Sequence, residues 1–97
     1  MTDLRKLLAF NMKFYRKKMS LSQAKLADLV DASENHIALI ETGRRFPSIS
    51  MLEMLATALE IDVLQLFSKE TIELYERKSL KKQILADIDN ILTIRLE

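Results

Sequence analysis

Residues 21–47, LSQAKLADLVDASENHIALIETGRRFP, decide the fold of this chain. Two serines, Ser22 and Ser33, each precede a run of residues with helical spacing. Serine is a favoured helix N-cap because its hydroxyl accepts a hydrogen bond from a free backbone N–H of the first turn. We therefore expect one helix from Ser22 to about Val30 and a second from Ser33 to about Gly43, with a tight turn between them.

The spacing of apolar residues gives this helix pair an inner and an outer face. The expected inner residues are Leu26, Ala27, Val30, Ile37 and Ile40, and alanine is small enough to let two helices cross closely. The residues left facing outward on the second helix are Glu34, Asn35, Ala38 and Leu39. A helix-turn-helix of this kind can lay its second helix in the major groove of DNA.

These residues belong to a longer pattern that resembles the phage-repressor and Cro-type (Xre) helix-turn-helix family. The resemblance covers roughly residues 4–68 and is carried by Arg16, Leu21-Ser22-Gln23, Leu26-Ala27, Ala32-Ser33, Ile37, Ile40-Glu41-Thr42-Gly43, Pro47-Ser48, Leu52, Leu55-Ala56, Leu59, Ile61, Leu64 and Leu66-Phe67. It implies an all-α, five-helix, lambda-repressor-like DNA-binding domain. We place this domain at residues 1–68 and a separate C-terminal helix at residues 69–97.

Apolar spacing predicts the remaining helices of the domain. The first should span residues 4–18, with a mostly apolar stripe of Leu4, Leu7, Leu8, Asn11, Phe14 and Tyr15. Ser48 should cap the fourth, whose inward residues are Ile49, Leu52, Leu55, Ala56 and Leu59. Asp62 should cap a short fifth helix over residues 63–67 that closes the core.

The C-terminal segment is expected to be an amphipathic helix for dimerisation. Its apolar stripe is formed by Leu80, Ile84, Leu85, Ile88, Ile91 and Leu92. The family domain already has a closed core, so this stripe needs another apolar surface, either a second copy or its own domain. The stripe is wider than a two-stranded seam and Lys81 interrupts it, which favours a bundle over a long parallel zipper.

Composition excludes several other classes of protein. The chain has 15 Lys or Arg against 14 Asp or Glu, a net charge of +1 with His neutral, and no cysteine. No segment approaches the roughly 18 consecutive apolar residues that span a bilayer, and no signal-peptide core is present. The single histidine, His36, has no partners at metal-ligand spacing. We expect a cytoplasmic protein that is not an enzyme and has no metal, no cofactor and no membrane partner.

The resemblance assigns candidate DNA contacts to two groups of residues. The expected base-reading residues are Ser33, Glu34, Asn35, His36, Ala38 and Leu39. The expected phosphate-binding residues are Ser22, Gln23, Arg44, Arg45, Lys17 and Lys18. Asparagine can bond adenine N6 and N7 together, a carboxylate can accept from cytosine N4, and apolar groups can touch a thymine methyl. For Glu34, a favourable charge near a helix N-terminus is an equally good explanation.

The resemblance also implies a structural ion pair and two unusual turns. Family members carry an Arg–Glu pair at the positions of Arg16 and Glu41, and a guanidinium can meet a carboxylate through two parallel hydrogen bonds. They usually carry glycine at the positions of Asp31 and Glu60. Those sites often need a left-handed backbone, which glycine adopts without a steric penalty.

The sequence predicts a homodimeric transcriptional regulator, more specifically a repressor, that binds an inverted repeat in double-stranded DNA. Two alternatives stay open. The helix-turn-helix could serve as a protein-interaction module, which the near-zero net charge favours. It could instead belong to a DNA-binding antitoxin, whose C-terminal helix binds a toxin or another antagonist protein.

Overall fold

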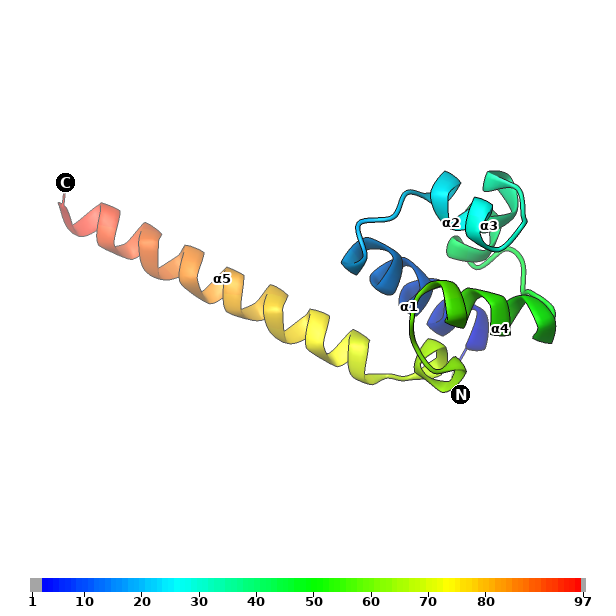
Figure 1. Cartoon of the computed structure of the whole chain (residues 1–97). Helices are drawn as coiled ribbons and strands as arrows, with labels where there is room; N and C mark the ends of the chain where they lie inside the picture. Colours follow the sequence, from blue (N-terminus) through cyan, green and yellow to red (C-terminus); the bar gives the residue numbers. More distant parts are fainter. Residues whose placement is uncertain (1–2, 97) are drawn as a thin grey trace.

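The computed structural model describes the backbone of residues 3–96 and the side chains of residues 3–83 and 86. Over these residues the only regular secondary structure is helical, which confirms the predicted all-α class. The elements are α1 (Leu4–Lys18), α2 (Gln23–Leu29), α3 (Glu34–Glu41), α4 (Ile49–Ala58), the 3-10 helix η1 (Val63–Phe67) and α5 (Glu70–Leu96). The first five elements form a compact head, and α5 projects from it as a long rod (Figure 1).

Side-chain caps fix where the elements of the head begin. At each of them an oxygen of the preceding residue accepts a backbone N–H of the first turn, and these residues are Asp3, Ser22, Ser33, Ser48 and Asp62. At η1 the cap is reciprocal, because the side chain of Gln65 also accepts from the backbone N–H of Asp62 at 2.8 Å. The predicted helix starts at residues 22, 33, 48 and 62 are therefore confirmed.

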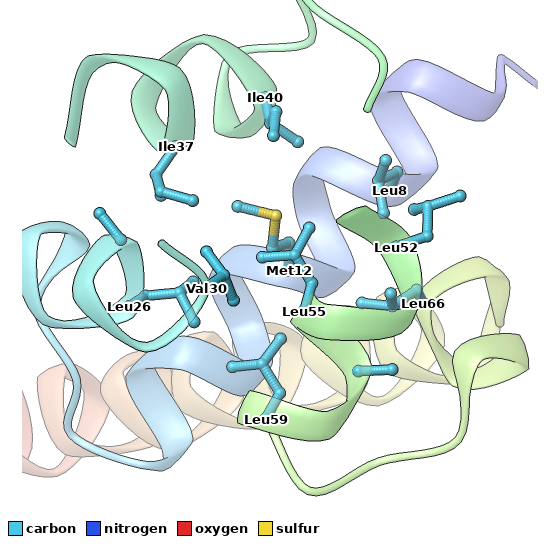
Figure 2. Packing of buried hydrophobic residues seen from close by; sticks show 12 residues of the cluster. Leu8, Met12, Leu26, Val30, Ile37, Ile40, Leu52, Leu55, Leu59 and Leu66 are labelled. Atoms are coloured by element: carbon cyan, nitrogen blue, oxygen red, sulfur yellow. The ribbon is translucent and has the colours of Figure 1, made fainter. Parts of the chain in front are cut away.

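One hydrophobic core joins all five elements of the head (Figure 2). The residues that α2, its C-cap and α3 were expected to turn inward are all buried: Leu26, Ala27, Val30, Ile37 and Ile40. Met12 of α1 lies at the centre with 0 % of its surface exposed. A flexible methionine suits this place because it fills the irregular space where several helices meet.

Two expected core residues are not in the core. Ile49 is 76 % exposed and Leu4 is 53 % exposed. Each is the first residue of its helix. The spacing of both residues matches the buried face of the helix, but at the helix end no neighbouring element covers that face. The fifth element also differs in kind, because residues 63–67 form a 3-10 helix and Leu66 is its one buried residue.

Three non-glycine residues have a left-handed backbone. Asp31 and Glu60, at the two positions expected from the missing glycines, have φ angles of 53° and 58°. Ser20, in the connection between α1 and α2, has a φ angle of 57° and was not expected. Such angles bring Cβ close to the backbone, so these three turns are strained relative to glycine.

The first two turns of α5 are packed against α1 of the head. Asn11 is fully buried, and its Nδ2 donates to the backbone oxygens of Leu66 and Ser68, each at 2.9 Å. The hydroxyl of Thr71 donates to Oδ1 of Asn11. One helical turn further, the ring of Tyr75 meets the ring of Phe10 edge-on with centroids 5.7 Å apart.

Only part of the expected dimerisation stripe lies among the described side chains. Leu80 is 62 % exposed, as an unpartnered apolar residue would be. The side chains of Ile84, Leu85, Ile88, Ile91 and Leu92 lie outside the described residues.

Candidate DNA-binding interface

The turn between α2 and α3 holds the two helices at a fixed angle. The backbone N–H of Ala32 donates to the carbonyl of Ala27 at 2.9 Å, which closes the end of α2. This bond requires the left-handed backbone at Asp31. Beyond the turn, Ile37 is fully buried and anchors the inner face of α3 in the core. The outer face of α3 is thereby presented on the surface of the head.

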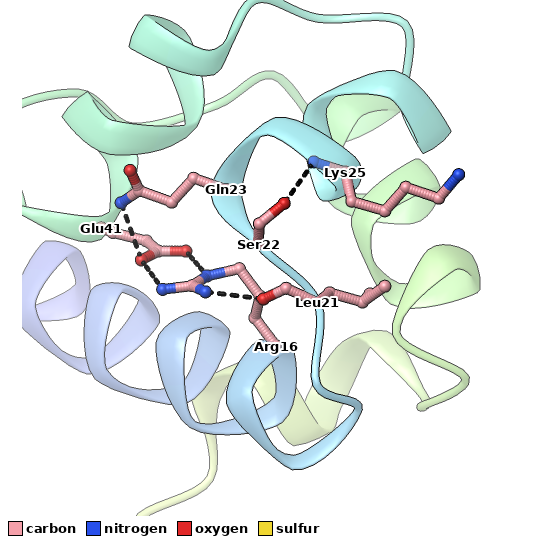
Figure 3. A network of polar contacts seen from close by, with 6 residues as sticks. All are labelled: Arg16, Leu21, Ser22, Gln23, Lys25 and Glu41. Atoms are coloured by element: carbon pink, nitrogen blue, oxygen red, sulfur yellow. Dashed lines mark hydrogen bonds and ion pairs between the residues drawn. The ribbon is translucent and has the colours of Figure 1, made fainter.

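A buried ion pair ties the end of α3 to the end of α1 (Figure 3). Nε of Arg16 donates to Oε2 of Glu41 at 2.6 Å, and Nη2 donates to Oε1 at 2.9 Å. The third guanidinium nitrogen, Nη1, donates to the carbonyl of Leu21 at 2.7 Å. The two side chains are 9 % and 2 % exposed, so the pair is shielded from water and its charges are satisfied by each other.

Gln23 joins the same network from the first residue of α2. Its Nε2 donates to Oε1 of Glu41 at 3.2 Å, and its side chain is half-buried. An amide nitrogen carries two hydrogens, so this bond uses one of the two donors. The neighbouring hydroxyl of Ser22 accepts from the backbone N–H of Lys25 at 3.0 Å as the helix cap. The ion pair thus orients a residue that we expect to contact phosphate.

The candidate base-reading residues lie at the N-cap of α3 and along the part of the helix that faces away from Ile37 and Ile40, and they differ in exposure. Ser33, Glu34 and Asn35 are exposed, whereas His36, Ala38 and Leu39 are half-buried. The hydroxyl of Ser33 is occupied as the cap of α3, where it accepts from the backbone N–H of His36 at 3.0 Å. The exposed polar edge of α3 therefore consists of the side chains of Glu34 and Asn35.

His36 contacts Arg45, a pairing that sequence reasoning missed. Nη1 of Arg45 lies 3.2 Å from Nδ1 of His36. A guanidinium only donates, so Nδ1 of His36 is the acceptor in this contact. The loop turns back because the backbone N–H groups of Arg44 and Arg45 both donate to the carbonyl of Leu39, at 3.0 and 3.2 Å. No side-chain pattern in the sequence indicates this turn of the loop, so the contact between His36 and Arg45 could not be predicted.

The expected phosphate-binding cations lie in two separate places. Arg44 and Arg45 are exposed in the loop directly after α3, beside the base-reading edge. Lys17 and Lys18 are exposed at the end of α1, where they line a groove between α1 and α5. The structure thus brings the Arg45 side chain to His36 of α3, while DNA contacts for all four cations stay predictions.

Neither metal-binding nor membrane-spanning features occur in the part of the chain that the structure describes. There, no three side chains of the ligating types His, Asp and Glu gather closely enough to hold a metal ion. None of the described helices combines the length and apolar character that crossing a membrane requires.

The fold and this interface define a helix-turn-helix protein. Residues 12–66 match the protein family described as Helix-turn-helix (HTH_3), and the chain belongs to this family. As a member of it, the chain is a DNA-binding regulator of transcription.

Individual proteins and a solved structure that resemble the chain also carry names of regulatory proteins. The chain is 40 % identical over 60 residues to the immunity repressor protein of Bacillus phage phi105, a match that spans 62 % of this chain and 42 % of the repressor. It is 32 % identical over 68 residues to the control protein C.SmaI of Serratia marcescens, covering 70 % of this chain and 81 % of that protein. The crystal structure of the hypothetical transcription factor NHTF from Neisseria superposes with a TM-score of 0.68 at 31 % identity, over 74 % of this chain and 85 % of that one.

Proposed function

We propose that the chain is a sequence-specific repressor of transcription that acts as a homodimer on an inverted-repeat operator. One observation carries this proposal: Glu34 and Asn35 form an exposed polar edge on a helix whose far end is held rigidly by the Arg16–Glu41 pair. A reading helix must keep its register against the base edges, and a buried two-bonded ion pair at its end supplies that rigidity.

Base reading would fall mainly to Asn35 and Glu34. The carboxamide of Asn35 can bond N6 and N7 of one adenine, and the carboxylate of Glu34 can accept from N4 of a cytosine. Ala38 and Leu39 offer apolar contact to a thymine methyl. Residues 34–41 contain no lysine or arginine, so guanine reading by a bidentate cation is absent from the helix itself. This composition favours sites with A·T steps, together with readout of DNA shape.

Phosphate contacts would flank the reading helix on both sides. Arg44 and Arg45 lie in the loop after α3. Gln23 lies at the start of α2, and one of the two hydrogens on its Nε2 is not used by the bond to Glu41. Contacts of this kind position the protein on the duplex but carry no sequence information. The division between a short base-reading edge and flanking donors fits a DNA ligand better than a protein partner.

The homodimer follows from the size of the reading edge. One helix contacts only a few base pairs, and two copies related by a two-fold axis would read half-sites on one face of the DNA, separated by about 34 Å or a multiple of it. Exposed apolar residues of α5, such as Leu80, supply a surface for pairing. The names of the two curated relatives, a repressor and a control protein, favour a regulator that occupies its operator.

The deciding experiment is selection from a random duplex DNA library, followed by the salt dependence of binding to the selected sequence. Enrichment of an inverted repeat, with affinity falling steeply as salt rises, is the expected result. A folded, dimeric protein that enriches no sequence would contradict the proposal and favour the protein-interaction alternative.

A further inference from the structure

A groove runs between α1 and the first turns of α5. Its volume is about 650 Å³, and its apolar walls are the side chains of Phe10, Phe14, Leu74 and Tyr75. All charged residues at its rim are lysines, and these are Lys13, Lys17, Lys18 and Lys78. Tyr75 is 56 % exposed and Leu74 is 44 % exposed, so the walls are open to solvent in the isolated chain. An apolar groove with this rim fits an apolar segment flanked by acidic residues.

The C-terminal end of the chain itself has that composition. Residues 91–96, ILTIRL, are mostly apolar, and Asp89 and Glu97 bracket them. More broadly, charge is divided along α5. Residues 69–82 contain five Lys or Arg and three Glu, whereas residues 83–97 contain three Asp or Glu and a single arginine, Arg95. The helix is therefore basic near the head and acidic near its far end.

This polarity discriminates between the two ways in which two such helices can pair. In a parallel pair, the basic cluster formed by Arg77, Lys78, Lys81 and Lys82 would lie against its own copy, and like charges would repel along more than one turn. In an antiparallel pair centred near residue 83, Arg77 and Lys78 would lie beside the partner's segment that contains Asp87 and Asp89, and only Lys81 and Lys82 would approach their own copies. Opposite charges then meet at both ends of the pair.

We propose that two copies of α5 pair in antiparallel orientation, and that residues 91–96 of each copy lie in the lysine-rimmed groove of the other. The charges favour a register in which residue 83 lies near the two-fold axis. Arg77 then lies opposite Asp89 of the second copy, and Leu74 lies opposite Leu92. This inference rests on the homodimer of the proposed function and specifies its geometry.

The length of α5 agrees with this arrangement. Its 27 residues extend for about 40 Å, and the helix leaves the head without folding back (Figure 1). The end of one rod therefore reaches the start of the other, where the groove lies. The two heads would lie at opposite ends of the pair, and residues 91–96 of each chain would contact the head of the other chain.

Cysteine cross-linking tests the orientation directly, because the chain has no cysteine of its own. Three variants are compared in the full chain: Leu74→Cys, Leu92→Cys and the combination of both. Residues 74 and 92 are about 27 Å apart along one helix, so a bond between them must join two chains. A short thiol cross-linker should give a covalent dimer of the combined variant and no covalent dimer of either single variant. Dimers of the single variants would show parallel pairing and overturn the inference.

Charge exchange tests the same geometry without a cross-linker. Asp87→Lys/Asp89→Lys and Arg77→Glu/Lys78→Glu should each raise the dimer dissociation constant by on the order of tenfold, because attraction becomes repulsion at both ends. All four changes in one chain should restore dimerisation, since every pair is then reversed together. Circular dichroism of each variant establishes that α5 remains helical. Weakening that the combined variant does not reverse would contradict the pairing.

The outcomes separate this inference from the proposed function. A dimer that binds an inverted repeat but is insensitive to the charge changes would overturn the antiparallel geometry and leave the function intact. A chain that stays monomeric at all concentrations and selects no DNA sequence would overturn both.

Discussion

Asn11 and Thr71 lie sixty residues apart in the sequence and are hydrogen-bonded to each other in the interior of the protein. The same asparagine donates to the last turn of η1 and to Ser68, so a single buried carboxamide connects α1, η1 and α5. These hydrogen-bond partners, the carbonyls of Leu66 and Ser68 and the hydroxyl of Thr71, belong to the segment that connects the head to the rod. Asn11 therefore sets the direction in which α5 leaves the domain.

Replacing Asn11 with leucine should lower the free energy of unfolding by about 3 kcal/mol. The near-isosteric change removes the Nδ2 donor from the buried carbonyl of Leu66 and the half-buried carbonyl of Ser68, and it leaves the Thr71 hydroxyl with only its long contact to Ser68 at 3.4 Å. Each lost hydrogen bond in such a site costs about 1 kcal/mol or more. Thr71→Val removes one of these bonds and should cost about 1 kcal/mol. Urea denaturation measures both, with Asn35→Leu on the exposed edge of α3 as the matched control. Equal losses for Asn11→Leu and the control would contradict the role of Asn11.

Truncation should show that the folded unit extends beyond Ser68. A chain ending at Ser68 loses the contacts of Thr71 and Tyr75, whereas a chain ending at Lys78 keeps them. We expect both to be monomeric, and the shorter one to be less stable by about 2 kcal/mol. Sedimentation gives the oligomeric state and urea denaturation the stability. Equal stability of the two chains would place the boundary of the folded unit at Ser68.

The Arg16–Glu41 pair should show strong coupling in a double-mutant cycle. Glu41→Gln leaves the buried guanidinium without its counter-charge and should cost about 3–5 kcal/mol, as should Arg16→Met. The double variant should lose much less than the sum, because neither charge is then left unpaired. Melting curves of the three variants give the coupling energy. Simple addition of the two single losses would mean that the contact contributes little.

The strained turns should accept glycine with a gain in stability. Asp31→Gly and Glu60→Gly should each raise the free energy of unfolding by on the order of 1 kcal/mol, because glycine adopts a positive φ without a steric penalty. Ser20→Gly should behave in the same way. Asp28→Gly, within α2, is the control and should destabilise by roughly 0.5 kcal/mol. A lower melting temperature for Asp31→Gly would contradict the analysis of this turn.

Base-reading and phosphate-binding residues should differ in how their loss affects DNA binding. Asn35→Ala should weaken binding to the selected operator by about 1–3 kcal/mol and relax the preference at one base pair. Arg45→Ala should weaken binding to all sequences alike and reduce the salt slope by about 1. Lys69→Ala, which removes the same charge just before α5, should leave the slope nearly unchanged. Titrations at several salt concentrations measure all three, and a sequence-dependent effect of Arg45→Ala would reassign this residue to base reading.

Most of the head could be predicted from sequence because its signals are local. Ser22, Ser33, Ser48 and Asp62 cap their helices by bonds to residues two or three positions away, which a linear pattern shows. The Arg16–Glu41 pair is a long-range contact, and it was predictable only through the resemblance to a family. The positive φ of Asp31 and Glu60 was indicated in the same way, by the glycines that relatives carry there.

What sequence reasoning missed depends on how the elements meet in space. Ile49 has the right period for the core, but α4 begins beyond the packed surface and leaves it exposed. Asn11 lies in an apolar stripe, and nothing near it in the sequence indicates that its partners come from residues 66–71. The contact between His36 and Arg45 likewise needs the loop to turn back onto Leu39, which is a property of the backbone.

The bond network around Asn11 has a consequence for how relatives of this protein diverge. It lies at the base of a rod of 27 residues, so a small change of angle there displaces the far end by many times the displacement at the junction. If two chains pair through this rod, the junction sets the distance between their reading helices. The spacer between operator half-sites can then evolve separately from the bases that are read, through substitutions that never touch DNA.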